Sequence, residues 1–166
     1  MPDISGRSRQ FVSFNVNGRS FGFDIRLIKE VTSSVRITPI PLKLRDVCGV
    51  VNIRGQVVLV LDISVSLGGQ ELVITGDSQI LILKTTSELE SISDFHPSSG
   101  IETIGAIPVG FLVDSVGELV AAEAGNIEEA PTHLLAEYRQ FVEGVVRQEY
   151  SPMVILNAGA ILEAGR

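Results

Sequence analysis

The sequence holds little of the chemistry that enzymes and metal sites use. Its 166 residues include one cysteine, Cys48, and two histidines, His96 and His133. A single thiol cannot form an internal disulfide, and without a Cys or His nearby it does not match a zinc site. We therefore expect a protein of the cytoplasm, a reducing compartment, with no metal and no cofactor.

Several catalytic motifs are absent as well. The chain contains no GxGxxG, GxxxxGK[ST] or HExxH pattern. A thiol nucleophile needs a base within hydrogen-bond reach and a third group that orients the base. Cys48 with His133 and a carboxylate stays open as a remote alternative, but no local motif supports it. We expect that the protein is not an enzyme.

Positive charge and long apolar runs are also scarce. Lys and Arg number 13 against 20 Asp and Glu, which gives a formal net charge of −7, whereas binding to nucleic acid requires a basic face. Mean hydropathy is +0.32, yet the apolar runs break at Asp62, Lys84 and Asn157, short of the roughly 20 residues that span a bilayer. Residues 1–9 are polar, lack a signal-peptide core and are expected to be flexible. We expect a protein partner, no nucleic acid and no direct insertion into a membrane.

Strand patterns outnumber helix patterns. Asn17-Gly18 lies between period-2 apolar runs and predicts a hairpin with a two-residue turn. In residues 24–31, apolar residues three apart after a possible Asp24 N-cap indicate one or two helical turns. Residues 131–141 look like a short helix. Residues 86–103 are rich in Ser and acids and predict a long mobile surface loop that is dispensable for folding.

The segment VVNIRGQVVLVLDIS, residues 50–64, is nearly all apolar but is interrupted by Asn52, Arg54 and Gly55. Arg54-Gly55 fits the tip of a tight hairpin, in which Gly55 supplies the unusual backbone angle. The turn does not explain the arginine, because many polar residues would suit that position. Arg54 could be a solvated turn residue, a contact to a partner, or the partner of a carboxylate in its own chain. Asp62, and Asn157 later in the chain, are expected to close strand ends through bonds to the backbone.

The two halves of the chain resemble each other. Residues 21–31 align without gaps to residues 109–119, and residues 49–62 align to residues 144–157. The order of the aligned segments is the same in both halves, so the chain looks like two related units of about five short strands each. Antiparallel units this small remove their edges by closing into barrels. The pattern predicts a mainly β domain over residues 10–163, made of two small barrels packed side by side with a groove between them.

Four segments, FGFDIRLIKEV, CGVVNIRGQVVLVLDIS, VGFLVDSVGEL and FVEGVVRQEYSPMVILN, occur in an order that resembles the CheW family of chemotaxis coupling proteins. The resemblance implies two SH3-like five-stranded β-barrels with short helices. It also implies a non-enzymatic adaptor that couples the cytoplasmic tips of chemoreceptors to the regulatory domain of a chemotaxis histidine kinase. Such an adaptor would be recruited to membrane receptor arrays through its partners. An adaptor of the same fold in another kinase cascade, for surface motility or gene regulation, is the alternative.

By the same resemblance, a set of residues is expected to lie on or beside the partner surface: Ile28, Glu30, Val31, Gly49, Asn52, Arg54, Gly55, Val116 and Leu119. Periodicity alone would place Ile28, Val31, Val116 and Leu119 in the core. Two features depart from the family pattern: Ser64 stands where many members have Arg, and the segment 86–103 is longer than the usual connection.

Overall fold

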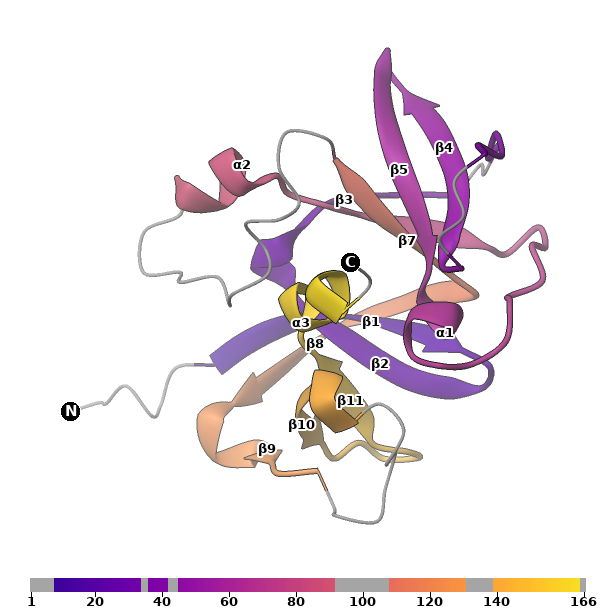
Figure 1. The fold of residues 1–166 in the computed structure, drawn as a ribbon. Coiled ribbons are helices and arrows are strands. Elements are labelled where there is room, and N and C mark those ends of the chain that lie inside the picture. The colour runs from indigo at the N-terminus through magenta and orange to yellow at the C-terminus, as the bar shows by residue number, and fades with distance from the viewer. Residues whose placement is uncertain (1–7, 34–35, 42–44, 92–107, 131–138, 165–166) are drawn as a thin grey trace.

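The computed structural model describes residues 8–33, 36–41, 45–91, 108–130 and 139–164. They form two sheets (Figure 1). One has the order β8-β1-β2-β11-β10-β9 and consists of β1 (Ser8–Val16), β2 (Arg19–Asp24), β8 (Ser115–Glu123), β9 (Ile127–Glu128), β10 (Val142–Val146) and β11 (Met153–Leu156). The other has the order β3-β6-β7-β5-β4 and consists of β3 (Ile28–Thr32), β4 (Val47–Ile53), β5 (Gln56–Asp62), β6 (Gln79–Leu83) and β7 (Val109–Val113). The helices are α1 (Ile63–Ser66), α2 (Thr86–Glu90) and α3 (Ala158–Ala164), with 3-10 turns η2 (Ile25–Leu27), η4 (Ala124–Asn126) and η5 (Arg139–Phe141).

Each sheet curls toward closure. In the six-stranded sheet, only the three residues of η4 separate β8 at one edge from β9 at the other. In the five-stranded sheet, a bridge between Thr38 and Val50 brings the chain after β3 onto β4. We call the two units the six-stranded barrel and the five-stranded barrel. Closure leaves few unpaired strand edges, which small antiparallel sheets must avoid.

The internal repeat is visible in the strand registers. Ile28 pairs with Leu83 and Val31 with Leu81, and their counterparts Val116 and Leu119 pair with Phe14 and Val12. The β4–β5 register, including its bulge between Val47 and Gly49, recurs in β10–β11. The parallel pairs β5–β7 and β11–β2 match in the same way. The two units therefore share one topology, as their sequences predict.

The repeats nevertheless exchange strands. The six-stranded barrel takes β1 and β2 from the first repeat and β8 to β11 from the second, while the five-stranded barrel takes β3 to β5 from the first and β6 and β7 from the second. Each repeat in the sequence thus contributes to both barrels. The alignment of the two repeats does not reveal this exchange. Barrels built from one repeat each and barrels that share strands of both repeats would have the same sequence pattern in every strand.

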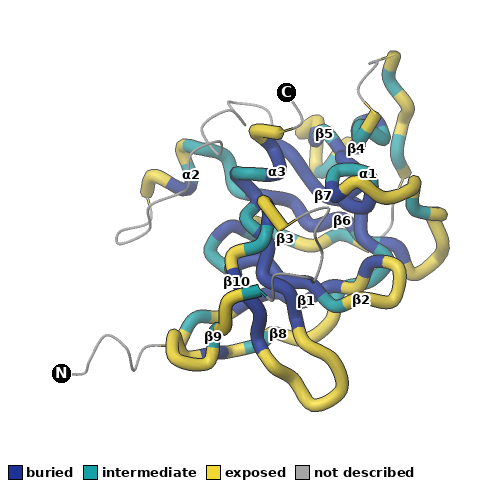
Figure 2. The backbone as a smooth tube through the Cα atoms, turned by 60° about the horizontal axis from the view of Figure 1, so that its bottom comes forward, coloured by how far each residue is buried: buried dark blue, intermediate teal, exposed yellow. Residues whose placement is uncertain are grey.

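The largest core lies between the barrels. The side chains of β1, β5, β6, β7 and β11 alternate between this shared core and the interior of their own barrel, and Phe21 and Phe23 of β2 also face the shared core. Phe14, Phe23 and Phe111 carry aromatic contacts from one sheet to the other, with ring centroids 5.1 and 5.4 Å apart. Figure 2 shows these central strands buried and the hairpin tips exposed. Strands that are buried on both faces explain the high mean hydropathy.

Several local predictions are confirmed. Asn17 and Gly18 have φ of 51° and 81° and form the two-residue turn of the β1–β2 hairpin. The Asp62 carboxylate accepts hydrogen bonds from Ser64 N and Leu72 N, and Asn157 Oδ1 accepts from Ala160 N.

Other local predictions are corrected. After η2, residues 28–32 form a strand and not a second helical turn, since pairing with β6 outweighs a weak local preference for helix. Residues 86–90 of the predicted loop form α2, and Leu89 is only 1% exposed in the shared core. The rest of that loop, residues 92–103, and most of the helix expected at residues 131–141 lie outside the described residues.

Candidate partner-binding surface

The β4–β5 hairpin projects from the five-stranded barrel and ends at Arg54-Gly55 (Figure 1). Arg54 has φ of 52° and Gly55 has φ of 84°, values of the type I′ turn that matches the twist of a hairpin. Asn52 Oδ1 accepts a hydrogen bond of 2.9 Å from Gly55 N, which fixes the turn. Gly55 thus supplies the positive φ of the tip, as the sequence predicts, and Asn52 fixes the turn through its side chain. An arginine in the left-handed region is disfavoured by about 1 kcal/mol, so backbone preference does not account for it.

The side chain of Arg54 forms an ion pair with Glu30. Arg54 Nη2 donates to Glu30 Oε1, which joins the hairpin tip to the outer strand β3. The Arg54 side chain is 74% exposed and that of Glu30 is 24% exposed, so most of the guanidinium still faces solvent. Of the three roles open for Arg54, the bond within its own chain is present. The exposed part of the fork keeps donors available to a partner.

Four apolar residues of the predicted surface lie on the outer strands of the two barrels. Ile28 and Val31 on β3 pair with Leu83 and Leu81, and both leucines face the shared core. On β8, Val116 and Leu119 pair with core residues of β1 in the same manner.

These four side chains therefore face the side on which the barrels meet. Ile28 and Val116 pack partly buried against the shared core, whereas Val31 and Leu119 are 37% and 59% exposed. A hydrogen bond of 2.7 Å from Val116 N to Gln79 Oε1 joins β8 to the first residue of β6, the neighbour of β3. Of the four apolar residues, Ile28 and Val116 thus belong to the edge of the core, whereas Val31 and Leu119 lie at the surface.

Gly49, another residue of the predicted surface, has a structural role in β4. It is buried, has φ of 148°, and a Cβ there would lie 2.2 Å from the carbonyl oxygen of Thr38. The glycine lets the Thr38–Val50 bridge approach β4 at the bulge. Its role is to close the barrel, and it offers no side chain to a partner.

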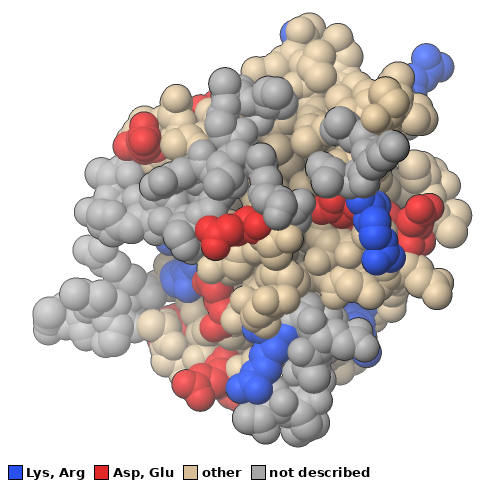
Figure 3. Space-filling view, viewed as in Figure 1, with Lys and Arg blue, Asp and Glu red and all other residues tan. Residues whose placement is uncertain are grey.

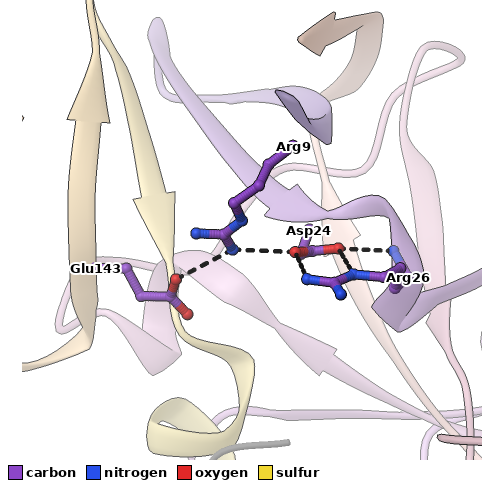
Figure 4. A network of polar contacts seen from close by, with 4 residues as sticks. All are labelled: Arg9, Asp24, Arg26 and Glu143. Atoms are coloured by element: carbon purple, nitrogen blue, oxygen red, sulfur yellow. Dashed lines mark hydrogen bonds and ion pairs between the residues drawn. The ribbon is translucent and has the colours of Figure 1, made fainter. Parts of the chain in front are cut away.

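A partly buried ionic network around the buried Asp24, which no sequence pattern indicated, lies where the chain crosses between the barrels ahead of β3 (Figure 4). The Asp24 carboxylate accepts bonds of 2.8 and 3.0 Å from Arg26 Nη2 and Nε, and 3.0 Å from Arg9 Nη2. Arg9 Nη2 also lies 3.5 Å from Glu143 Oε1 on β10. Asp24 in addition caps η2 by accepting from Arg26 N. The pairing of Asp24 with Arg26 is local, but only the folded topology brings Arg9 and Glu143 to it.

The network sets the charge states of its carboxylates. Burial by itself would raise the pKa of Asp24, but the bonds from Arg26 and Arg9 outweigh it and lower the pKa. Burial also raises the pKa of Glu143, which Arg9 opposes only partly. Asp24 is therefore held as a carboxylate that ties the end of β2 to η2 through Arg26 and to β1 through Arg9.

Cys48 does not have the environment of a nucleophile. Burial, with Asp62, Glu71 and Asp46 nearby, raises the pKa of its thiol to about 12. An activated cysteine requires a lowered pKa. His133, the base considered above, lies outside the described residues. Among the residues that the structure describes, no three Cys, His, Asp or Glu side chains group as metal ligands.

On the face shown in Figure 3, acidic and basic side chains are scattered and form no continuous basic field. Within the described part of the chain, no helix is long and apolar enough to cross a bilayer.

Comparison with known proteins assigns the family. A profile described as the CheW-like domain matches residues 10–166, most of the chain. The chain belongs to the CheW family. The chemotaxis protein CheW of Bacillus subtilis is 25% identical over 154 residues, covering 93% of this chain and 86% of the relative. That of Thermotoga maritima is 24% identical over 157 residues, covering 93% and 87%.

A solved structure, the scaffolding protein TtCheW from Thermoanaerobacter tengcongensis, superimposes with a TM-score of 0.69 at 24% identity, covering 90% of this chain and 84% of that one. The predicted fold class, two SH3-like β-barrels side by side, is confirmed, with β9 as a sixth strand in one of them. The chain therefore shares the family and the fold of these proteins.

Proposed function

We propose that the protein is a cytoplasmic, non-enzymatic adaptor that couples the tips of chemoreceptors to a chemotaxis histidine kinase. Family membership supports this proposal. The observation that carries it is the Arg54–Glu30 ion pair, which links the projecting hairpin to β3 and leaves the guanidinium mostly exposed. An arginine in a disfavoured backbone conformation is consistent with selection for its side chain.

The receptor tip, a helical hairpin, would bind along β3 and β8. Val31 and Leu119 would receive its apolar side chains, as in the helix-in-groove mode of recognition. Ile28 and Val116 would support them from the shared core. Arg54 would bind carboxylate or carbonyl oxygens, for which its planar fork suits it. The kinase regulatory domain would use the same hairpin region or another barrel end.

Co-sedimentation tests the proposal. The chain is mixed with a membrane-embedded chemoreceptor fragment and the histidine kinase, and pelleted kinase and its autophosphorylation are measured. The adaptor should bring kinase to the pellet and activate it. Binding of neither protein, or activation that is unchanged when the adaptor is left out, would reject the adaptor function.

A further inference from the structure

The strand β8 leaves the five-stranded barrel through a corner of a single residue. β7 ends at Val113, Asp114 makes the turn, and β8 begins at Ser115. Asp114 N donates to Asn15 O at 3.0 Å, and the Asp114 carboxylate accepts from Asn17 N at 2.7 Å. These bonds tie the corner to β1 and to the β1–β2 turn. They do not fix the direction of β8 relative to the sheet that the chain has just left.

The side chain of Gln79 makes that connection. Gln79 is the first residue of β6 and pairs with Val113 in the five-stranded sheet. Because β8 is an edge strand, an N–H that points away from β1 has no partner in a ladder. Gln79 Oε1 accepts from one such group, Val116 N, at 2.7 Å. Within the described residues, no other hydrogen bond joins β8 to the five-stranded sheet, so Gln79 braces the two barrels against each other.

The first repeat satisfies the equivalent N–H in another way. Val116 aligns with Ile28, whose N–H donates to Ile25 O and closes the 3-10 turn η2. The residue aligned with Ile25 is Val113, and the chain passes from β7 to β8 without a 3-10 turn. A side chain from a different strand thus replaces a local backbone bond. The repeated topology does not demand the bond from Gln79, which points to a role of this residue in the second repeat alone.

The braced position lies between the two strands of the apolar partner surface. β3 pairs with β6 as far as Thr32 and Ile80, the residue next to Gln79. Val116 belongs to the partner surface itself, and Leu119 follows it after a bulge between β8 and β1. A bulge bends its strand, so the direction of β8 at Val116 decides where Leu119 lies. Through β6, Gln79 therefore links the position of β8 to that of β3.

We propose that Gln79 is a positioning residue of the partner surface: by holding Val116 N it keeps β8 at the distance from β3 that a helical receptor tip requires. Gln79 acts through Val116 and Leu119 and not through a contact of its own. The inference rests on the proposed function and adds a residue outside the surface on which that function depends. Without the brace, β8 takes several positions, and the receptor binds more weakly because it has to order the strand.

The test compares two substitutions of Gln79 with the same substitutions of Gln148, an exposed residue of the connection between β10 and β11. Gln79→Met keeps the length of the side chain but removes the acceptor, whereas Gln79→Glu keeps an acceptor for Val116 N. A labelled receptor fragment is titrated with each full-length variant at about 0.5 M salt, which screens the added charge beyond a few ångström. The Tm and the hydrogen exchange of the Val116 amide are measured on the same variants.

Gln79→Met should weaken receptor binding about fivefold and speed exchange of the Val116 amide, while Tm falls by less than about 4 °C. Gln79→Glu should bind like the parent and keep the amide protected. Both variants of Gln148 should match the parent in all three measurements.

Three results would overturn the proposal. Parent-like affinity, or parent-like exchange of the Val116 amide, in Gln79→Met would show that the brace is not needed. Equal weakening by Gln79→Met and Gln79→Glu, with the amide protected in the latter, would make Gln79 a direct contact. A fall in Tm above about 8 °C in Gln79→Met would make the bond a requirement of the fold. Failure of the proposed function is distinguishable from these results, because the parent itself would then not bind the receptor fragment.

Discussion

Arg54→Gly separates the partner role of Arg54 from its part in folding. Glycine removes the guanidinium but adopts the left-handed turn conformation without strain, whereas alanine keeps the strain. Loss of the ion pair should lower the free energy of unfolding, and relief of the backbone strain should raise it by a similar amount, so stability should change little. Partner binding should weaken, because glycine does not replace the contact that the guanidinium makes.

The magnitudes follow from exposure. A pair in which one side chain is 74% exposed and the other 24% is worth about 0.5–1 kcal/mol. Relief of the left-handed conformation returns about 1 kcal/mol, which the greater freedom of glycine in the unfolded chain reduces by about 0.5. Arg54→Gly should therefore change stability by less than about 0.5 kcal/mol. Arg54→Ala should lose about 0.5–1 kcal/mol, a fall in Tm of about 1–4 °C.

The assay pairs urea unfolding with kinase activation in the receptor assembly. Arg54→Gly should unfold like the parent yet reduce activation about tenfold, because a lost charge-assisted contact is worth about 1.5–3 kcal/mol. The exchanged pair Arg54→Glu with Glu30→Arg is the control. It can restore the ion pair, so recovered activation would limit Arg54 to shaping the hairpin. Full activation by Arg54→Gly, or a stability loss above about 2 kcal/mol, would refute the reasoning.

Three further changes test other parts of the structure. Val31→Asp should leave the fold intact, because the side chain is 37% exposed, but should weaken binding of a labelled receptor fragment by a few kcal/mol; unchanged affinity in titration would remove β3 from the surface. Leu89→Ala should cost about 3 kcal/mol and lower Tm by about 9 °C in calorimetry, whereas a shift below about 2 °C would show that α2 is not part of the core. Asp24→Asn should cost about 2 kcal/mol at pH 7, less than for a fully buried pair because its arginine partners are 35% and 40% exposed. The folded pKa of Asp24 is below its unfolded value, so this stabilisation is present above about pH 4 and lost as pH falls through the folded pKa. The unfolding free energies of parent and variant should therefore converge in acid, and a gap that widened there would reverse the assigned sign.

The hairpins and the repeat could be predicted from the sequence because their determinants are local. Asn17-Gly18 and Arg54-Gly55 are two-residue turns with positive φ, which Asn17 and the two glycines favour. Of the one or two helical turns predicted for residues 24–31, the first is present as η2 with its Asp24 cap, and a second is absent for a physical reason. A bulge between Ile28 and Glu30 adds one residue to β3, so Ile28 and Val31, three apart, face the same side of a strand.

Nonlocal features could not be predicted. The sequence left three roles possible for Arg54. Its pairing with Glu30 could not be chosen among them, because the pairing depends on the distance between β3 and the hairpin tip. The ionic network of Arg9, Asp24 and Glu143 and the exchange of strands between repeats depend on topology alone. The helix α2, which buries Leu89, had one weak sequence signal. Thr85 and Glu88 have the spacing of a capping box and could have identified a helix within the acidic segment.

Site-directed crosslinking tests the central claim, that the receptor tip binds beside β3. A single cysteine is introduced by Val31→Cys in a Cys48→Ala background. The control is Val73→Cys in the same background, since Val73 is 76% exposed and belongs to the connection between α1 and β6, not to β3, β8 or the β4–β5 hairpin. Cysteines are placed along the receptor tip, and disulfide formation is measured in the assembled complex. Rapid crosslinking is expected at residue 31 and little at residue 73. Equal crosslinking at both, or none at residue 31 in a complex that activates the kinase, would contradict it.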